Sequence, residues 1–362
     1  MKLEVLSEQQ AISLMVLFIS GSAVVLSIGG QAGGDIWLAV ILSGLLALPI
    51  VTVYARLHSL YPHYDAFQII IVIFGNTFGR LICLVYTWFA FHLGALVLRN
   101  FGEFIITVGL EETPQLFPVT LFALLCLWIV KEGIEVLGRW SNFFFRFAII
   151  IVLITTALAL PELNMDHFRP FLFNGIMPVL QGTANVFAFP FAQTIVLWLA
   201  FSGFQKRSSP YRIYWLGILM GTLVILIITT LVVAIIGVEI YKHSYFPAYI
   251  AIARLNIADF VQRLEIIVAI MFIISSFVKV STCLLATCKG VAAITNFHDY
   301  RFTVTPITLL MISTSYFLFD DIMQMLFWAQ DIWPIYAFPF QVILPIIVLI
   351  GGEYRAKSLK KQ

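Results

Sequence analysis

The chain has 362 residues, of which 61% are hydrophobic and only 11% are Asp, Glu, Lys or Arg. Soluble domains carry about 25% charged residues, so this chain lacks the polar side chains needed to cover a water-exposed surface. Together with a mean hydropathy of +0.99, this composition indicates an integral membrane protein. The net charge of +2 is small, and the absence of a basic face or Lys/Arg run outside the membrane flanks argues against nucleic-acid binding.

Ten apolar stretches are long enough, or nearly long enough, to cross a bilayer, since a hydrocarbon core of about 30 Å requires about 20 helical residues. The expected spans are residues 9–28, 36–57, 80–108, 116–131, 140–160, 183–203, 213–237, 263–288, 304–319 and 333–351. The fourth and ninth are short. Only the connections 161–182 and 238–262 are long enough to carry structure of their own. We therefore expect one all-α transmembrane domain formed by residues 1–362.

Two of these stretches are interrupted near their middle. Gly21, Ser22 and Ala23 break the first, which we expect to be a retained span because no small-residue cleavage site precedes it. Phe187 to Pro190 break the sixth. Broken helices in corresponding positions of two chain halves indicate a substrate site at the bilayer midplane, where unwound backbone offers free polar groups. The alternatives are a helix-packing patch of small residues and a simple proline kink.

Basic residues fall mostly on one side of the expected spans. Cytoplasmic loops are enriched in Lys and Arg, so this asymmetry predicts orientation. With the N-terminus inside, only four lie outside, namely Arg169, Lys242, Arg254 and Arg263. Fifteen lie inside, namely Lys2, Arg56, Arg80, Lys131, Arg139, Arg146, Lys206, Arg207, Arg212, Lys289, Arg301, Arg355, Lys357, Lys360 and Lys361. We therefore expect an even number of spans and two cytoplasmic termini.

Lys279 is the most unusual single residue because it lies well inside the eighth apolar stretch. An ionisable side chain at such a depth is costly and is usually functional or paired. We expect its ammonium in the gap between the eighth span and the break in the first, although it could instead snorkel to the inner interface. Ser275, Ser276 and Thr282 lie on nearby turns, where their hydroxyls line a cation site or bond their own helix.

Further polar side chains inside the apolar stretches are candidate ligand contacts. Gln193 follows the break in the sixth span, and its amide either binds a ligand or holds a neighbouring helix. Tyr86 and His92 lie in the third span and have the same two interpretations. Phe187 and Phe189 face lipid or close over an apolar part of a ligand. Arg99 and Glu103 are spaced as an i, i+4 pair near the outer end and are expected to satisfy each other, with an outer gate as the second interpretation.

Motifs that carry catalysis are absent from the sequence. We find no phosphate-binding glycine loop, no nucleophile elbow, no His-Glu-x-x-His and no carboxylate cluster at metal-ligand spacing in the spans. The four cysteines lie in or beside apolar runs and are expected to be buried, reduced side chains. We therefore expect no enzyme activity, no cofactor and no metal site.

Six short segments spread over the chain carry a family resemblance. They are Ser7-Glu8-Gln9-Gln10, Gly21-Ser22-Ala23, Ala32-Gly33-Gly34-Asp35-Ile36-Trp37, Phe189-Pro190-Phe191, Arg263-Leu264-Glu265 and Phe277-Val278-Lys279. In the order and spacing of these segments, the chain resembles the spore germination permease family, the integral-membrane B subunit of nutrient germinant receptors. That family belongs to the amino acid–polyamine–organocation (APC) transporter superfamily.

The resemblance implies a LeuT-like fold of ten transmembrane helices in a five-plus-five inverted repeat. Repeat one would cover about 9–160, repeat two about 183–351, and helices 1 and 6 would be broken. It also implies that Gly21 to Ala23 offer backbone amides to a nutrient carboxylate, and that Lys279 takes the place of a bound cation. The implied partners are the lipid bilayer, an A-type subunit and a lipoprotein C-type subunit.

Two functions therefore compete. The first is a germinant receptor subunit in the inner membrane of a spore, where a small molecule, an amino acid above all, binds at the midplane and triggers germination. The second is a proton- or sodium-coupled amino acid permease that acts alone. An ion-conducting subunit is a further alternative, because such a fold can enclose a hydrated cavity. A neighbouring gene for a lipoprotein, or uptake of labelled substrate, would separate the first two.

Overall fold

The computed structural model describes residues 4–205, 209–255 and 263–359 of the chain. In these segments every regular element is helical, and extended chain pairs only at one isolated bridge between Leu6 and Phe204. Five of the basic residues used above to predict orientation lie outside the described residues, namely Lys2, Lys206, Arg207, Lys360 and Lys361.

The first half of the chain forms five α-helices and four short 3₁₀ helices. They are α1 (Glu8–Ser20), η1 (Gly21–Val24), η2 (Gly30–Asp35), α2 (Ile36–Leu60), α3 (Ala66–Val108), α4 (Leu116–Glu132), α5 (Ile134–Ala159), η3 (Leu160–Glu162) and η4 (Met165–Phe168). The two η helices that follow α5 lie in the connection expected to carry structure of its own.

The second half has more interruptions, with three π turns (η5, η7 and η8) and one 3₁₀ turn (η6). Its elements are α6 (Ile176–Val186), η5 (Phe187–Phe191), η6 (Ala192–Thr194), α7 (Ile195–Ala200), α8 (Pro210–Ile236), α9 (Val238–His243), α10 (Pro247–Ala253), α11 (Glu265–Thr295), α12 (Arg301–Phe317), α13 (Ile322–Phe327), η7 (Trp328–Ile332), α14 (Trp333–Phe338), η8 (Pro339–Ile343) and α15 (Leu344–Leu359). π turns within helices occur mostly at functional sites.

Seven helical segments of the described chain are long and apolar enough to cross a membrane, which makes this a multi-pass integral membrane protein. They are Gly30–Leu60, Ala66–Val108, Ile134–Glu162, Ile176–Ala200, Pro210–Ile236, Glu265–Thr295 and Ile322–Lys357. The three other expected spans coincide with α1, α4 and α12, which have 13, 17 and 17 residues. The count of ten spans therefore stays a prediction.

Several helical segments begin earlier than the sequence predicts, among them the sixth, Ile176–Ala200, and the last, Ile322–Lys357. The third begins at Ala66 and not near residue 80, because Asp65 and Gln68 form a capping box at its start. Within it, Gly75 has φ 77° and kinks the helix. The fifth begins at Ile134 and not near residue 140, directly after Gly133, which has φ 97°. Arg139 therefore lies inside a helix rather than before one.

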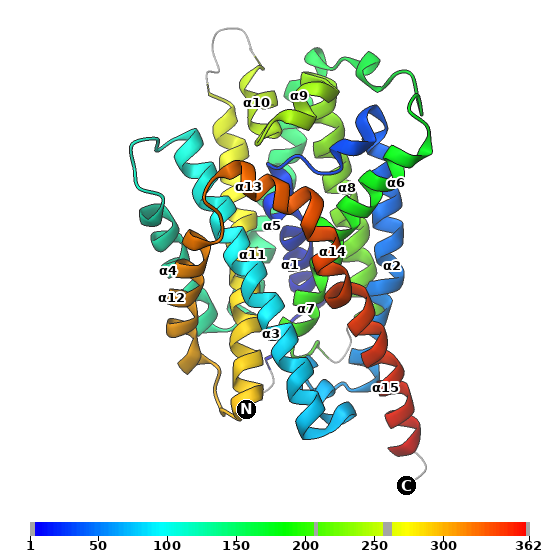
Figure 1. Ribbon diagram of the computed structural model, residues 1–362, viewed down its shortest axis with the longest axis vertical. Coiled ribbons are helices and arrows are strands. Elements are labelled where there is room, and N and C mark those ends of the chain that lie inside the picture. Colours follow the sequence, from blue (N-terminus) through cyan, green and yellow to red (C-terminus); the bar gives the residue numbers. More distant parts are fainter. Residues whose placement is uncertain (1–3, 206–208, 256–262, 360–362) are drawn as a thin grey trace.

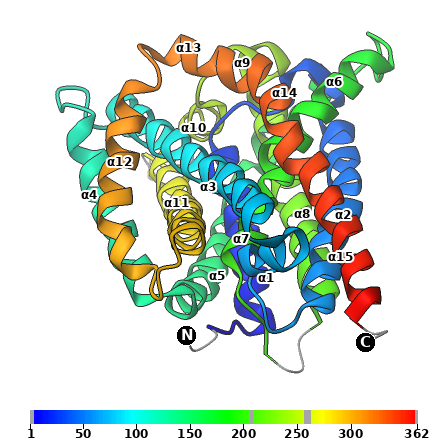
Figure 2. The same ribbon diagram turned by 60° about the horizontal axis from the view of Figure 1, so that its bottom comes forward.

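The short helices α1 and α7 lie in the interior, with α2, α3, α5, α8 and α11 packed around them (Figure 2). Nine of the 13 residues of α1 are buried, and so are all six of α7. The first helix starts and the last helix ends at the lower end of the molecule in Figure 1, whereas α9 and α10 lie at the upper end. The two interrupted segments that the sequence singled out are therefore central in the fold.

Arg99 and Glu103 form a buried ion pair within α3, with 2.8 Å between Arg99 Nη2 and Glu103 Oε1. Arg99 Nη1 also donates to the Tyr316 carbonyl at 2.9 Å and so links α3 to α12.

We expect Arg99→Met to lower the free energy of unfolding by about 3–5 kcal/mol, because it leaves the Glu103 carboxylate buried and unpaired. Denaturant titration of the purified protein checks this. Arg99→Met combined with Glu103→Leu should recover most of the loss, and a double variant no better than the single one would contradict the account.

Candidate functional site

The first helix ends where the sequence is interrupted. Gly21 closes α1 with its N–H donating to the Leu17 carbonyl, and its φ of 22° and ψ of −128° turn the chain out of the helix. A residue with a Cβ is strained at such a positive φ, which explains the glycine. All four residues of η1 are buried, and Ser22 Oγ accepts from Asn100 Nδ2 at 3.4 Å.

The sixth helix is also interrupted at the predicted place. Phe189 has φ −144° and ψ 112° inside π turn η5, and the bond from Phe189 to Pro190 is cis. The Ala188 carbonyl lies just before this extended residue and accepts from two side chains of the last apolar segment. Trp333 Nε1 and Gln341 Nε2 each donate to it at 3.0 Å. The break therefore has polar partners and is more than a proline kink.

Lys279 on α11 lies between the two breaks. Its Nζ is 5.2 Å from the centroid of the Phe18 ring and 4.9 Å from that of Phe189, which places it over one ring from each broken segment. A Cβ added to Gly21 would lie 2.5 Å from Lys279 Cδ, so the lysine stem packs directly on the main chain of the first break. The ammonium thus lies beside the carboxyl-terminal end of α1, where the helix dipole favours a positive charge.

The Lys279 ammonium has no hydrogen-bond partner among the described residues, and its side chain is 0% exposed. Aromatic faces stabilise a cation by about 2 kcal/mol when desolvated, far less than burying a charge costs. Because the side chain is fully buried and its Nζ lies over the Phe18 and Phe189 rings, it does not snorkel to the inner interface. A buried, unpaired ammonium between two broken helices is suited to receiving an anionic group.

The hydroxyl residues near Lys279 behave in two ways. Thr282 Oγ1 donates to the Val278 carbonyl of its own helix at 2.7 Å, the ordinary alternative. The buried hydroxyls of Ser275 and Ser276 have no partner within the described segments. Two hydroxyl oxygens on this helix are therefore available to a ligand, an ion or water.

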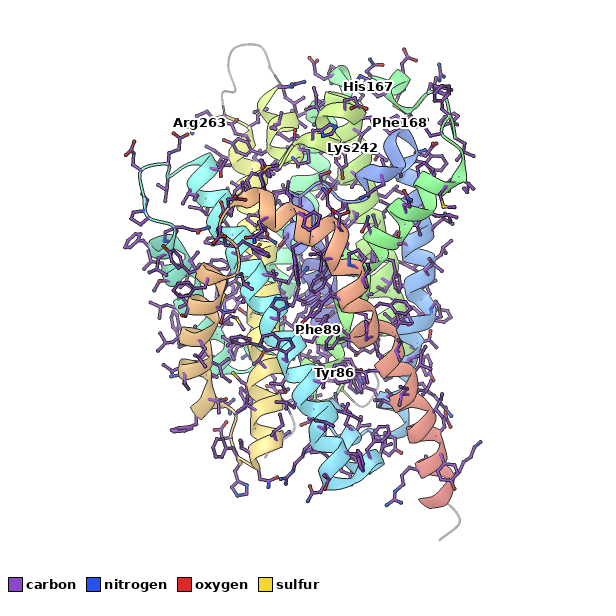
Figure 3. All side chains as sticks on the ribbon, viewed as in Figure 1. Tyr86, Phe89, His167, Phe168, Lys242 and Arg263 are labelled. Carbon is purple, nitrogen blue, oxygen red and sulfur yellow. The ribbon has the colours of Figure 1, made fainter. Side chains whose placement is uncertain are left out.

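The other predicted ligand contacts are spread over a larger region. Tyr86 packs edge-on against Trp198, with 6.2 Å between ring centroids, and Figure 3 shows it on α3 below Phe89. His92 contacts an aromatic cluster formed by Trp88, Trp328 and Tyr336. Their ring contacts are thus to residues other than Lys279 and the first break. A ligand role for either residue stays a prediction.

Phe187 and Gln193 flank the sixth-helix break. Phe187 is partly buried and packs against the core. Gln193 is 2% exposed, and no donor reaches its Oε1 from the described residues. Sequence reasoning missed Phe18, Trp333 and Gln341. Gln341 could have been found, because it is an amide inside a strongly apolar stretch, as Gln193 is.

Two cavities of the molecule are lined in part by charged residues. A small cavity of about 50 Å³ is lined by Phe189, Gly30 and Lys242, and Lys242 lies in the upper part of Figure 3. A second cavity, of about 590 Å³, is lined by Glu4 near the start of the chain and reaches Lys289, whose Nζ donates to the Ala200 carbonyl at 2.5 Å and to Ser202 Oγ at 2.6 Å. Lys279 is fully buried and lines neither of these two cavities.

Tyr241 on α9 fixes the chain that leaves the first break. Its hydroxyl accepts from the Ile28 N–H at 3.0 Å and donates to the Ile28 carbonyl at 2.9 Å.

We expect Tyr241→Phe to lower the free energy of unfolding by about 1–3 kcal/mol, because it leaves buried backbone groups unsatisfied. Denaturant titration measures the loss. As a control, Tyr245→Phe removes only the contact to Met323 and should cost less than about 0.5 kcal/mol. Equal effects of the two variants would contradict the anchoring role.

Comparison with known proteins identifies the family. The sequence profile of a family described as "Spore germination protein" matches residues 5–320. The chain belongs to the spore germination protein family. Among its relatives are spore germination protein KB of Bacillus subtilis (strain 168), 24% identical over 98% of this chain and 96% of the relative, and spore germination protein YndE of the same strain, 25% identical over 72% of each chain.

A solved structure shows the same general fold at low sequence identity. Mhp1, a nucleobase-cation-symport-1 family transporter in a closed conformation with bromovinylhydantoin bound, superposes with a TM-score of 0.59. The match is 13% identical in sequence and covers 94% of this chain and 77% of Mhp1. The all-helical fold of this spore germination protein is therefore transporter-like.

Within the described part of the chain, no group of three His, Cys, Asp or Glu side chains could hold a metal ion.

Proposed function

We propose that this protein is the transmembrane subunit of a nutrient germinant receptor, which binds a small molecule at the membrane midplane and thereby triggers spore germination. An amino acid is the favoured nutrient. The observation that carries the proposal is the unpaired ammonium of Lys279, buried between the breaks at Gly21 and Phe189. A carboxylate at this point would supply the missing counter-charge.

The proposed architecture is the ten-helix inverted repeat, with repeats at about 9–160 and 183–351. The transporter-like fold and the central position of the two breaks support it. In this arrangement Lys279 acts as a built-in cation that links α11 to both broken segments. A ligand shifts the protein between two states only if it binds one of them more tightly. A carboxylate meets this condition if it pairs with Lys279 in the state where the two breaks close around it and not in the other state.

The proposed location is the inner membrane of the bacterial spore, with both termini in the cytoplasm. Family membership supports this, and so does the start of the first helix at the same end of the molecule as the end of the last (Figure 1). The proposed partners are an A-type and a lipoprotein C-type receptor subunit. They would convert the ligand-bound state of this subunit into the germination signal.

The transporter-like fold favours one second candidate, an amino acid permease coupled to protons or sodium ions. A permease moves its ligand across the bilayer, whereas a receptor needs only to bind it. The two differ in uptake of labelled nutrient by proteoliposomes that contain the purified protein. Saturable uptake that requires an ion gradient would favour the permease.

A complementation experiment tests the receptor function. Spores that lack the gene are supplied with the wild-type protein or with Lys279→Met, and germination is followed with a panel of L-amino acids and simple sugars. The proposal expects the wild-type gene to restore the response to at least one carboxylate nutrient and the variant, at the same protein level, not to restore it. Wild-type germination in the variant would contradict the proposal.

A further inference from the structure

The last membrane segment contributes a buried amide to the break in the sixth helix. Gln341 lies in π turn η8 and is 1% exposed. Its Nε2 donates to the Ala188 carbonyl at 3.0 Å, beside the 3.0 Å hydrogen bond from Trp333 Nε1. The Trp333 ring is itself stacked on Phe89, with 5.8 Å between centroids. The hydrogen bond to Ala188 sets the orientation of the Gln341 amide.

Fixing Nε2 also fixes the other end of the amide. Because Nε2 is bonded to Ala188, the Gln341 Oε1 points away from that carbonyl, and no donor from the described residues reaches it. Gln193 Oε1 also lacks a donor among the described residues. The turns that carry the two residues, η6 and η8, contact each other. Two buried acceptors without donors therefore belong to adjoining segments at the sixth-helix break.

The chemistry of these two oxygens limits what can satisfy them. Each buried acceptor without a partner costs about 1–3 kcal/mol, so a bound group that donates to both is favoured. A primary ammonium has three donors and no acceptor, whereas a hydroxyl has one donor and two lone pairs. A carboxylate has no donor to offer to these two oxygens. The two oxygens are therefore suited to a cationic group, whereas the Lys279 ammonium is suited to an anionic one.

We propose that Gln341 and Gln193 form an acceptor subsite for the primary ammonium group of the nutrient, which makes the nutrient an amino-carboxylate rather than a sugar or a simple carboxylic acid. The inference rests on the proposed function and adds to it the residues that would recognise the ammonium group of the favoured nutrient. Gln341 and Gln193 determine specificity. Trp333 is a positioning residue, because it acts through the Ala188 carbonyl and offers no acceptor to the ligand.

Matched ligand pairs test the subsite. The purified protein is titrated with L-alanine and L-lactate, and with γ-aminobutyrate and γ-hydroxybutyrate, so that only a hydroxyl replaces the ammonium. The wild type should bind at least one amino member about tenfold or more tightly than its hydroxy partner, because a site built for a polar group rejects its analogue. Gln341→Met, which is similar in size but lacks the amide, should bring that ratio close to one.

Two further variants separate specificity from structure. Gln193→Met should also reduce the ratio, and it carries the test if Gln341→Met does not fold. Trp333→Phe removes the other hydrogen bond to Ala188 and should weaken both members of a pair equally, with the ratio unchanged. An unchanged ratio in both glutamine variants would overturn the subsite and leave water as the partner of these oxygens.

The same titration distinguishes this inference from the proposed function. If the wild type binds both members of a pair equally and loses both in Lys279→Met, the midplane site stands and the ammonium subsite falls. If the wild type binds none of the four compounds and no other amino acid, the proposed function falls and the subsite falls with it.

Discussion

Lys279→Met should abolish nutrient binding while the free energy of unfolding stays the same or rises. The two effects separate because the ammonium has no hydrogen-bond partner among the described residues. Replacing a buried charge with an apolar side chain of similar volume is often neutral or stabilising. A carboxylate ligand, in contrast, would lose its counter-charge, and truncating one partner of a buried charge pair costs about 2–5 kcal/mol of binding free energy.

Isothermal titration and denaturant unfolding of the same purified samples measure both quantities. Lys279→Arg serves as the control, because it keeps the charge but places a planar fork where a compact ammonium packs against Gly21. It should retain part of the binding and lose stability. A Lys279→Met protein that binds the nutrient as tightly as the wild type would remove Lys279 from the site.

Gly21→Ala should destabilise the protein and impair binding, because a single methyl group fills the first break. The added Cβ would lie 2.5 Å from Lys279 Cδ, at a backbone φ of 22° that disfavours a side chain. Overpacking of this kind typically costs about 1–3 kcal/mol. Gly21→Leu should abolish the ligand response altogether, since its side chain would occupy the space of the lysine stem.

A double-mutant cycle tests whether Lys279 is the group that Gly21 accommodates. Lys279→Ala removes Cδ, so combining it with Gly21→Ala should cost less than the sum of the single variants, with a coupling of about 0.5–3 kcal/mol. Ala23→Gly is a control substitution in the same turn that adds no atom. Strictly additive effects of Gly21→Ala and Lys279→Ala would mean that the glycine is needed only for its φ angle.

The two breaks and the position of Lys279 were predictable from sequence because each involves residues that are unusual inside an apolar helix. A Gly-Ser-Ala segment and a proline interrupt helices that are otherwise continuous runs of apolar residues, and a lysine inside such a run must have a compensating environment. The predicted gap between the eighth span and the first break is where the structure places the Lys279 side chain. Local signals of this kind do not depend on knowledge of the packing.

Contacts between distant segments were not predictable in the same way. That Trp333 and Gln341 bond the Ala188 carbonyl depends on the crossing of the last and sixth segments, more than 140 residues apart. His92 was expected in the third span, but its ring partners Trp328 and Tyr336 could not be predicted, because they come from the far end of the chain. The start of α3 at Ala66 was not predicted, since Gly75 and Asn76 interrupt the apolar run that follows it.

The most direct test of the midplane site is a thermal-shift measurement on the purified protein with a panel of L-amino acids and simple sugars, made on the wild type and on Lys279→Met. A ligand that binds only the native state stabilises it by about 2.7 kcal/mol at one hundred times its Kd. The account predicts that at least one amino acid raises the Tm of the wild type and leaves that of Lys279→Met unchanged. An equal shift in both proteins, or a shift with sugars alone, would contradict it.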